Sequence, residues 1–245
     1  MSTKSKFKSG VLTFYDGTTF ETVAAKAPVV FQDDFCGPDV VIPASAESGC
    51  KWLKKIVGSG VTVARVANQA NGVVAATLLA TDEAEDAILY SNDCLELSTA
   101  QGLVFECRAA LHVVPTTGTE KANAVIGVAS AYNANPDTTA VNGWFRLSGD
   151  SKIYWEVDDD STNTAATDTG VVAVADVYHI FRIEFVAANN VLFFIDGAQV
   201  GQATVFSPAA PGVQPYIGCN KVKSSANTGL ATLYVDYVKI WQKRS

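Results

Sequence analysis

One acidic stretch of the chain has residue types and a spacing that could do chemistry. It runs from Trp155 to Asp160 and places carboxylates at alternate positions, Glu156, Asp158 and Asp160. Alternate side chains of a strand point to one face. Paired carboxylates hydrolyse glycosidic bonds, and retaining enzymes hold them about 5–5.5 Å apart. Four residues of regular strand span about 13 Å at roughly 3.3 Å per residue, so a bulge would have to bring Glu156 and Asp160 together.

The same stretch has two other interpretations. Calcium takes six to eight oxygen ligands, and Asp158, Asp159, Asp160 and Asn163 offer such oxygens, although their spacing does not match an EF-hand loop. Alternatively, the stretch is the acidic end of a strand that enters a solvated turn, because Ser161 to Thr164 reads as a loop. We favour the solvated turn, and therefore predict no catalytic, cofactor-binding or metal-binding residues and no cofactor.

Histidines and tryptophans are the other candidates. The only histidines are His112 and His179, which excludes a metal site made of several histidines, and we interpret both as structural. Flat indole rings can stack on sugars, and Trp144 and Trp155 lie in or beside strands that could form a concave face. Core packing is the alternative for these two rings and for Trp52 and Trp241. The sequence leaves both readings open.

The elements that would position these residues are predominantly strands. Leu103 to Val113 alternates apolar and polar residues most clearly. One face should carry Leu103, Phe105, Cys107, Ala109, Leu111 and Val113. Three strands, at 179–186, 191–195 and 199–205, are separated by Asn189-Asn190 and Asp196-Gly197, which favour tight hairpins.

Other strand patterns occur at 61–66, 73–80, 124–131, 143–147, 152–157, 171–174 and 232–241, and residues 82–90 form the only helix-like stretch. Many short strands with turn signals between them predict an all-β, two-sheet antiparallel sandwich or barrel.

Composition limits the class of protein. A chain of 245 residues with 48% apolar content fits one all-β domain of roughly 200–250 residues. The net charge is −7 and most acidic residues lie between 82 and 176, which argues against nucleic acid as a partner. Neither a signal peptide nor an apolar run of about 18 residues is apparent, so we expect no export and no membrane partner. The five cysteines have irregular spacings, and we expect them reduced, with Cys107 in the core.

The N-terminal segment differs from the rest. Lys4, Lys6 and Lys8 precede a short hairpin pattern at 11–20 with Asp16-Gly17 at its turn. We predict an N-terminal arm or hairpin over residues 1–27, which could anchor the chain, and a sandwich domain over residues 28–245.

Several phrases of the sandwich resemble concanavalin A-like domains, including laminin-G modules and laminarinase-type glucanases. They are Tyr178 to Glu184, Phe193 to Gly197, the closing strand Tyr234 to Gln242, and the early Asp33-Asp34-Phe35. The resemblance implies a jelly-roll sandwich. In those glucanases the pattern Glu-x-Asp-x-Glu supplies nucleophile, helper and acid. Glu156 and Asp158 match the first two places, but position 160 is Asp, one methylene shorter than the expected acid.

A second resemblance covers most of the chain. Phe7 to Asp16, Ala46 to Gly49 with Lys51-Trp52 after it, and Gly102 to Ala109 look like virion structural proteins of tailed bacteriophages. Those proteins couple a short N-terminal segment to a concanavalin A-like domain on the head surface. The resemblance implies a non-enzymatic protein that decorates or cements the capsid. Its partners would be the major capsid protein or other virion proteins, and it would be a homo-oligomer, located in the virion after assembly in the host cytoplasm. A carbohydrate-binding module that contacts host glycans is the alternative, and a glucanase is the third reading.

Overall fold

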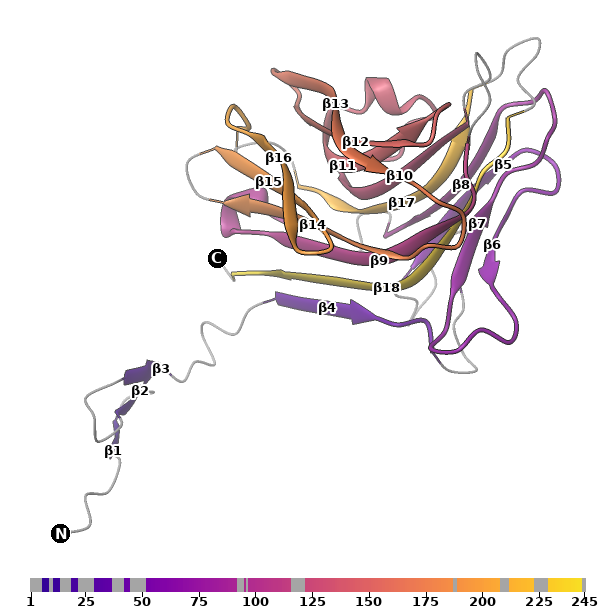
Figure 1. The fold of residues 1–245 in the computed structure, drawn as a ribbon. Helices are drawn as coiled ribbons and strands as arrows, with labels where there is room; N and C mark the ends of the chain where they lie inside the picture. The colour runs from indigo at the N-terminus through magenta and orange to yellow at the C-terminus, as the bar shows by residue number, and fades with distance from the viewer. Residues whose placement is uncertain are drawn as a thin grey trace.

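Two antiparallel sheets packed face to face make up most of the chain (Figure 1). The computed structural model describes residues 6–8, 11–13, 19–21, 29–36, 42–44, 52–91, 95, 97–115, 122–186, 189–207, 212–222 and 229–243. The predicted all-β jelly-roll sandwich is confirmed. In the described residues the only helices are two single 3-10 turns, η1 (Thr99–Gln101) and η2 (Pro136–Thr138), and none is long and apolar enough to cross a membrane.

The first sheet has seven strands. In spatial order they are β13 (Asn163–Val172), β12 (Lys152–Asp159), β11 (Val141–Ser148), β10 (Ala122–Ala129), β17 (Gln214–Lys221), β8 (Glu85–Tyr90) and β5 (Leu53–Val57).

The second sheet has eight strands. Along its path lie β16 (Ala198–Ala203), β15 (Asn190–Ile195), β14 (His179–Val186), β9 (Val104–Val113), β18 (Thr232–Gln242), β7 (Val74–Thr77) and β6 (Thr62–Arg65). Off this path, β4 (Val29–Asp33) pairs with β18.

The predicted three-stranded meander is present as β14, β15 and β16. Its two hairpin turns contain residues with left-handed backbone angles, Asn189 at φ 66°, Asp196 at φ 51° and Gly197 at φ 82°. Asn, Asp and Gly tolerate this region best, which explains the turn signals in the sequence. The carboxylate of Asp196 also accepts from the backbone N–H of Ile180 at 2.8 Å and contacts His179 Nδ1 at 2.6 Å.

The core lies between the two sheets. Phe145 of β11 is fully buried and packs against Phe181 and Phe193 of the opposite sheet, with ring centroids 5.1 and 5.4 Å apart. The alternation predicted for 103–113 is confirmed from Leu103 to Leu111, where the odd-numbered residues are buried, whereas Val113 is only half-buried. Cys107 is a buried free thiol as predicted, and Cys36 and Cys219 are also free, whereas Cys50 and Cys94 lie outside the described residues.

Two sequence predictions of local structure were wrong. Residues 85–90 of the helix-like stretch form strand β8, and all six are buried, so both faces of the strand are covered and no alternation appears. The strand predicted at 171–174 is the end of the longer β13, which already begins at Asn163 inside the stretch that reads as a loop. β13 is polar and exposed at the sheet edge, so apolar periodicity does not reveal it.

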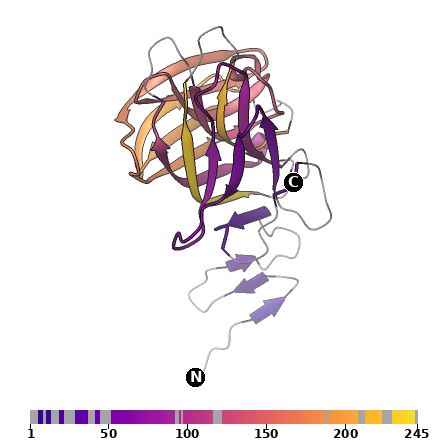
Figure 2. The ribbon, with the colours of Figure 1, turned by 90° about the vertical axis from the view of Figure 1, so that its right-hand side faces the viewer.

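The N-terminal segment forms a small sheet of its own. β2 (Val11–Thr13) and β3 (Thr19–Glu21) pair as the predicted hairpin, and β1 (Lys6–Lys8) pairs with β2. The predicted Asp16-Gly17 turn lies outside the described residues. Figures 1 and 2 show this three-stranded sheet apart from both sheets of the sandwich. The boundary between 1–27 and 28–245 stays a prediction.

Candidate functional site

The face of the seven-stranded sheet that points away from the core carries the most concentrated set of buried polar side chains. We call it the outer face. One part of it is an apolar patch, whose members are Leu53, Ile88, Tyr90, Val125, Ala129, Trp144 and Tyr216. Beside this patch lie the polar residues Asp86, Asn123, Arg146, Glu156 and Asn220, each no more than 8% exposed. Burial on an outward face means that another segment covers it.

The covering segment is the connection between β10 and β11, residues 130–140, which we call the strap. Tyr132 packs on the apolar patch and its hydroxyl donates to Asp86 at 2.7 Å. Asn220 Nδ2 donates to the Ala134 carbonyl at 3.3 Å, and the Tyr216 hydroxyl donates to the Asn133 carbonyl at 3.5 Å. These bonds hold the first half of the strap against β8 and β17.

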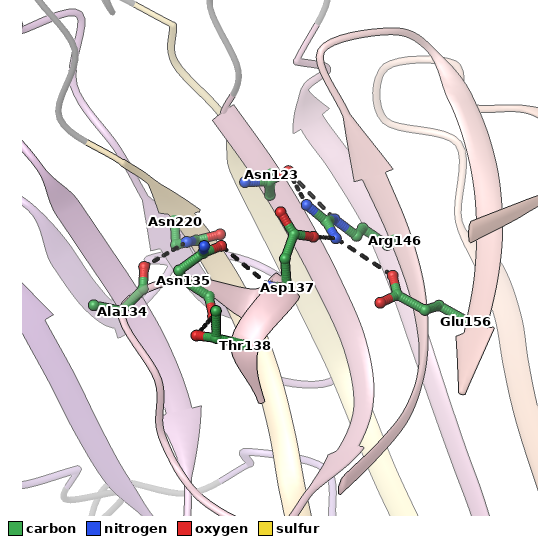
Figure 3. Close-up of polar contacts among 8 residues, drawn as sticks. All are labelled: Asn123, Ala134, Asn135, Asp137, Thr138, Arg146, Glu156 and Asn220. Carbon is green, nitrogen blue, oxygen red and sulfur yellow. Dashed lines mark hydrogen bonds and ion pairs between the residues drawn. The ribbon is translucent and has the colours of Figure 1, made fainter. Parts of the chain in front are cut away.

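The second half of the strap is stabilised by its own side chains. Asn135 caps η2, because its Oδ1 accepts from the backbone N–H of Asp137 at 3.2 Å. The Thr138 hydroxyl donates to the Asn135 carbonyl at 2.9 Å, and Asn133 Nδ2 donates to the Thr138 carbonyl at 3.0 Å. The result is a compact turn that presents Asp137 to the sheet (Figure 3).

Arg146 is the centre of the polar cluster. Its Nε and Nη2 donate to Asn123 Oδ1 at 3.4 and 3.3 Å, and its Nη1 donates to Glu156 Oε2 at 3.3 Å. The same Nη1 also forms an ion pair with the carboxylate of Asp137. Figure 3 shows Asn123, Arg146 and Asp137 converging from two strands and the strap. One guanidinium therefore joins β10, β11, β12 and the strap.

Burial alters the acidity of two carboxyls beneath the strap. Burial raises the pKa of Glu156 above its usual value, and the charge of Arg146 and the nearby Trp144 indole oppose this shift. Burial also raises the pKa of Asp86, opposed by the Tyr132 hydroxyl and by Lys55. Among the described residues, Asp86 Oδ1 and Asn220 Oδ1 are buried without a hydrogen-bond partner. These two residues face each other across β8 and β17.

Replacing Asp86 with asparagine should change the pH dependence of stability. The raised pKa means that the folded chain holds this proton more tightly, so its contribution is complete below pH 3.8 and is lost as pH rises through the folded pKa. An asparagine at this position would not titrate, and its amide can donate toward Asn220. The free energy of unfolding of Asp86→Asn, minus that of the unsubstituted chain, should therefore become more positive above pH 3.8, as urea unfolding at several pH values would measure.

Asp168 offers a control of opposite sign. The hydrogen bond from Lys152 lowers the pKa of Asp168, so its stabilising contribution is present above pH 3.8 and lost in acid. Asp168→Asn should thus lose relative stability as pH rises, where Asp86→Asn gains it. If relative stability changed with pH in the same direction for both variants, the opposite pKa shifts of Asp86 and Asp168 would be contradicted.

The carboxylates singled out in the sequence are only partly brought together. Glu156 and Asp158 lie on the outer face of β12, whereas β12 ends at Asp159 and Asp160 lies in the following turn with φ 69°. Register shifts in the β12–β13 pairing lie between Lys152 and Tyr154 and between Trp155 and Val157, ahead of this turn. Glu156 is paired with Arg146 beneath the strap, so its carboxylate is not free at a surface.

The oxygens considered for calcium have hydrogen-bond donors of their own. Asp159 Oδ1 accepts from the backbone N–H groups of Ser161 and Thr162, and its Oδ2 accepts from that of Ser207 at 2.7 Å. Asp158 Oδ1 accepts from the backbone of Asp160 at 2.9 Å. Within the described part of the chain no group of three or more His, Cys, Asp or Glu side chains is arranged to hold a metal ion. This geometry is that of a capped turn.

The tryptophans are not exposed as the sugar-binding hypothesis requires. Trp155 points into the core and stacks on Phe193 at 5.1 Å, which fits the core-packing alternative and not the sugar-binding one. Trp144 lies on the outer face but is fully covered, and Trp52 is 2% exposed. Trp241 is half-buried between Lys239 and Arg182.

The two histidines make local pairs. His112 Nδ1 contacts Asp176 Oδ1 at 2.8 Å, and its ring stacks on Tyr234 at a centroid distance of 4.6 Å. His179 contacts Asp196 within the meander. Both arrangements fit the structural roles predicted for them.

Sequence reasoning missed Asn123, Asp137 and Arg146. The available signal was the single arginine within the apolar segment 143–147, since a charged residue on a covered strand requires a partner. Its partners come from another strand and from the strap, which only the fold brings near.

Comparisons with known proteins agree on the fold alone. No family model matches the chain, and no curated protein matches it. Among solved structures, a protein of unknown function from Shewanella oneidensis MR-1 has a TM-score of 0.57 at 12% identity, covering 91% of this chain and 89% of that one. The laminarinase catalytic domain from Thermotoga maritima MSB8 has a TM-score of 0.58 at 12% identity, covering 90% and 99%.

A Bacillus licheniformis β-glucanase has a TM-score of 0.53 at 16% identity, covering 88% of this chain and 98% of that one. The chain is therefore a jelly-roll sandwich of the concanavalin A-like kind. Identities this low define the fold and carry no activity over to this chain.

Proposed function

We propose that this chain is a non-enzymatic structural protein of a tailed-bacteriophage virion, where it decorates or cements the capsid surface. The non-enzymatic part of the proposal is supported by the burial of the outer face beneath the strap. Glu156, which matches the nucleophile position of laminarinase-type glucanases, is 4% exposed, ion-paired with Arg146 and covered by the strap. A retaining hydrolase needs two carboxyls about 5–5.5 Å apart at an accessible bond. Asp160, in the turn beyond β12, is a poor second member of such a pair.

The N-terminal sheet supports the assembly part of the proposal. β1, β2 and β3 have three residues each. So small a sheet is marginal by itself in water, and strands of this kind are stabilised when they pair with a further sheet edge. Together with the resemblance of residues 7–16 to virion proteins, this favours an arm that pairs with a neighbouring capsid or virion subunit. Such attachment also fits a homo-oligomer on the virion.

The other two readings have less support. Glycan stacking on Trp144 and Trp155 requires exposed rings, and neither ring faces solvent. The glucanase reading requires a free Glu156. Neither alternative is favoured by a specific contact of these residues.

Mass spectrometry of purified virions tests the location. We expect many copies of the chain per particle, and absence or trace amounts would refute the proposal.

Attachment can be tested by adding purified protein to capsids that lack it. A variant without residues 1–20 should bind at least about tenfold fewer copies, because a tenfold loss corresponds to only about 1.4 kcal/mol of main-chain pairing. Replacing Lys4, Lys6 and Lys8 with glutamine separates the contribution of the lysine charges to binding from that of main-chain pairing. Equal melting temperatures would show that the sandwich is intact, and unchanged binding by the truncated variant would remove the anchoring role.

A further inference from the structure

We propose that the open edge of β4 in one copy of the chain binds the N-terminal arm of a second copy, which adds a strand to the eight-stranded sheet. This inference rests on the proposed anchoring role of the arm and deepens it, because it names a second copy as the partner and β4 as the acceptor. The contact would consist mainly of main-chain hydrogen bonds between the two copies.

β4 lies at a gap in the eight-stranded sheet. β18 pairs with β9 along one side, and along its other side it pairs first with β7 and then with β4. Beyond β7 the sheet continues with β6, but beyond β4 the described residues supply no further strand. Figure 1 shows β4 as the outermost strand beside β18. One edge of β4 is therefore open to an added strand.

The hydrogen-bond pattern identifies the groups at this open edge. In an antiparallel ladder the N–H and C=O of one residue point to the same neighbouring strand, and successive residues alternate. Phe185 of β14 donates to the Leu103 carbonyl at 2.8 Å, so Leu103 points to β14 and the next residue, the first of β9, points to β18. That residue is paired with Trp241, so Ile240 points to β4, where its partner is Phe31. The residues on either side of Phe31 therefore direct their N–H and C=O groups to the open edge.

Val30 and Gln32 are these two residues. Each offers one N–H and one C=O to an added strand, and both side chains are exposed. Val30 is 58% exposed, more than any other large apolar side chain in the described part of the chain. The acidic residue of β4, Asp33, accepts from Trp52 Nε1 of its own chain at 3.1 Å. An incoming strand would thus meet main-chain groups and an apolar side chain.

The other edge strands have features that discourage strand addition. Exposed edges are commonly protected by lysine, proline, bulges or short length. β5 contains Lys54 and Lys55, β6 has four residues and ends in Arg65, and the pairings of β13 and β16 contain register shifts. β4 pairs with β18 without a shift, and its sequence, VVFQD, has no lysine, arginine, proline or glycine. The lack of protection indicates that a strand pairs with this edge.

The N-terminal arm is the occupant that the chain itself offers. Its sheet has the order β1-β2-β3, so β1 and β3 are outer strands with one open edge each. Strands of three residues gain stability by extending a larger sheet. The charges are complementary, because β1 contains Lys6 and Lys8, whereas Asp34 lies exposed directly after β4. The arm and the β4 edge are therefore two incomplete elements that one contact would complete.

A second copy supplies the arm. Within one chain the arm sheet and β4 do not pair, and Figure 1 shows the arm sheet beyond the N-terminal end of β4 and away from the sandwich. The arm is thus placed to reach a neighbouring molecule, whose β4 edge is open in the same way. Exchange of an identical element between copies is a low-cost route to an oligomer. The expected product is a homo-oligomer in which each copy gives one arm and accepts another.

Complementation between two variants tests the exchange. The arm-less variant lacks residues 1–20 and keeps the β4 edge, whereas the edge-blocked variant, Gln32→Pro, keeps the arm and loses one N–H of the edge. Proline is tolerated in an edge strand where its nitrogen faces away from the ladder, so pairing with β18 should persist. Analytical ultracentrifugation should show the unsubstituted chain as an oligomer and each variant alone as a monomer. A mixture of the two variants should form a complex that contains both.

Gln32→Ala is the matched control, because it removes the same side chain and keeps the backbone N–H. It should oligomerise as the unsubstituted chain does, and its melting temperature is the reference for the proline variant. Val30→Lys, which places a protective charge at the edge, replaces Gln32→Pro if the proline variant does not fold.

The results that would overturn arm exchange are distinct from one another. Self-association of the arm-less variant would indicate that β4 pairs with β4 of another copy, and self-association of the edge-blocked variant would indicate that arms pair with arms. A monomeric unsubstituted chain, or two variants that do not associate when mixed, would also refute it. These measurements need no capsid. A chain absent from virions could still exchange arms, and a monomeric chain could still be abundant on virions, so the two proposals fail separately.

Discussion

Replacing Glu85 with alanine should destabilise the chain by about 3–5 kcal/mol, as expected when one member of a buried ion pair is removed. Glu85 and Lys221 are both fully buried, and Lys221 Nζ lies 3.3 Å from Glu85 Oε2. The carboxylate also accepts from the backbone of Leu79 at 2.8 Å and from the Thr81 hydroxyl. Its loss would leave the Lys221 charge buried and the 79–81 segment without its acceptor. Urea unfolding would measure the change.

The surroundings of Lys221 could stabilise its charge without Glu85, and they also suggest a control for the prediction. Three carbonyls also accept from Nζ, those of Leu79, Thr81 and Gly229, at 2.5, 2.6 and 3.2 Å. A loss below about 1 kcal/mol would mean that these carbonyls alone stabilise the ammonium, against the prediction. Replacing both members, Glu85→Leu with Lys221→Met, should cost less than the single change, because no unpaired charge remains. Lys152→Ala, in an exposed pair with Asp168, should cost far less than either change in the buried pair.

Phe145→Ala should cost about 3–5 kcal/mol, since the ring is fully buried at the contact between the sheets and its removal leaves a cavity. Phe181 and Phe193 of the opposite sheet would lose their edge and tilted contacts with it. Phe145 lies between Trp144 and Arg146, so the cavity would also loosen β11, which carries the central residue of the polar cluster. Thermal and urea unfolding would measure the loss.

Ile180→Ala is the matched control for the Phe145 change. Ile180 is a large apolar residue next to Phe181 in the chain, but it is 37% exposed on the other side of its strand. We expect a cost well below that of Phe145→Ala. Similar costs for the two variants would mean that the sheets do not pack through the phenylalanine cluster.

Local sequence was sufficient wherever a strand had one covered face. The alternation from Leu103 to Val113 predicts a strand, and Asn189 and Asp196 predict tight turns. Both signals are local, because period-two burial and positive φ depend on residues that are neighbours in the chain. Apolar alternation did not identify the strand at 85–90, because both faces of this strand are buried, one against the core and the other on the outer face beneath the strap. It also failed at Asn163, where an exposed edge strand has no apolar period.

The candidate site, in contrast, depends on residues that are distant from one another in the sequence. Glu156 was visible in the sequence as a carboxylate on a strand, but its chemistry depends on Arg146, ten residues earlier in the chain, and on Asp137 in the strap. Registers between β10, β11 and β12 set the first contact, and the path of the strap sets the second. Neither is encoded in residues next to Glu156, so its acidity and accessibility could not be predicted from sequence.

By itself, then, the sequence determined an all-β sandwich, its meander, its closing strand and the positions of its carboxylates. Only the tertiary structure decided which carboxylates are available. Strand formation depends on burial patterns and turn residues that are local, whereas the availability of an ion depends on the charge placed beside it and the segment placed over it. At Glu156 the fold supplies Arg146 and the strap, and these turn a catalytic candidate into one member of a buried charge network.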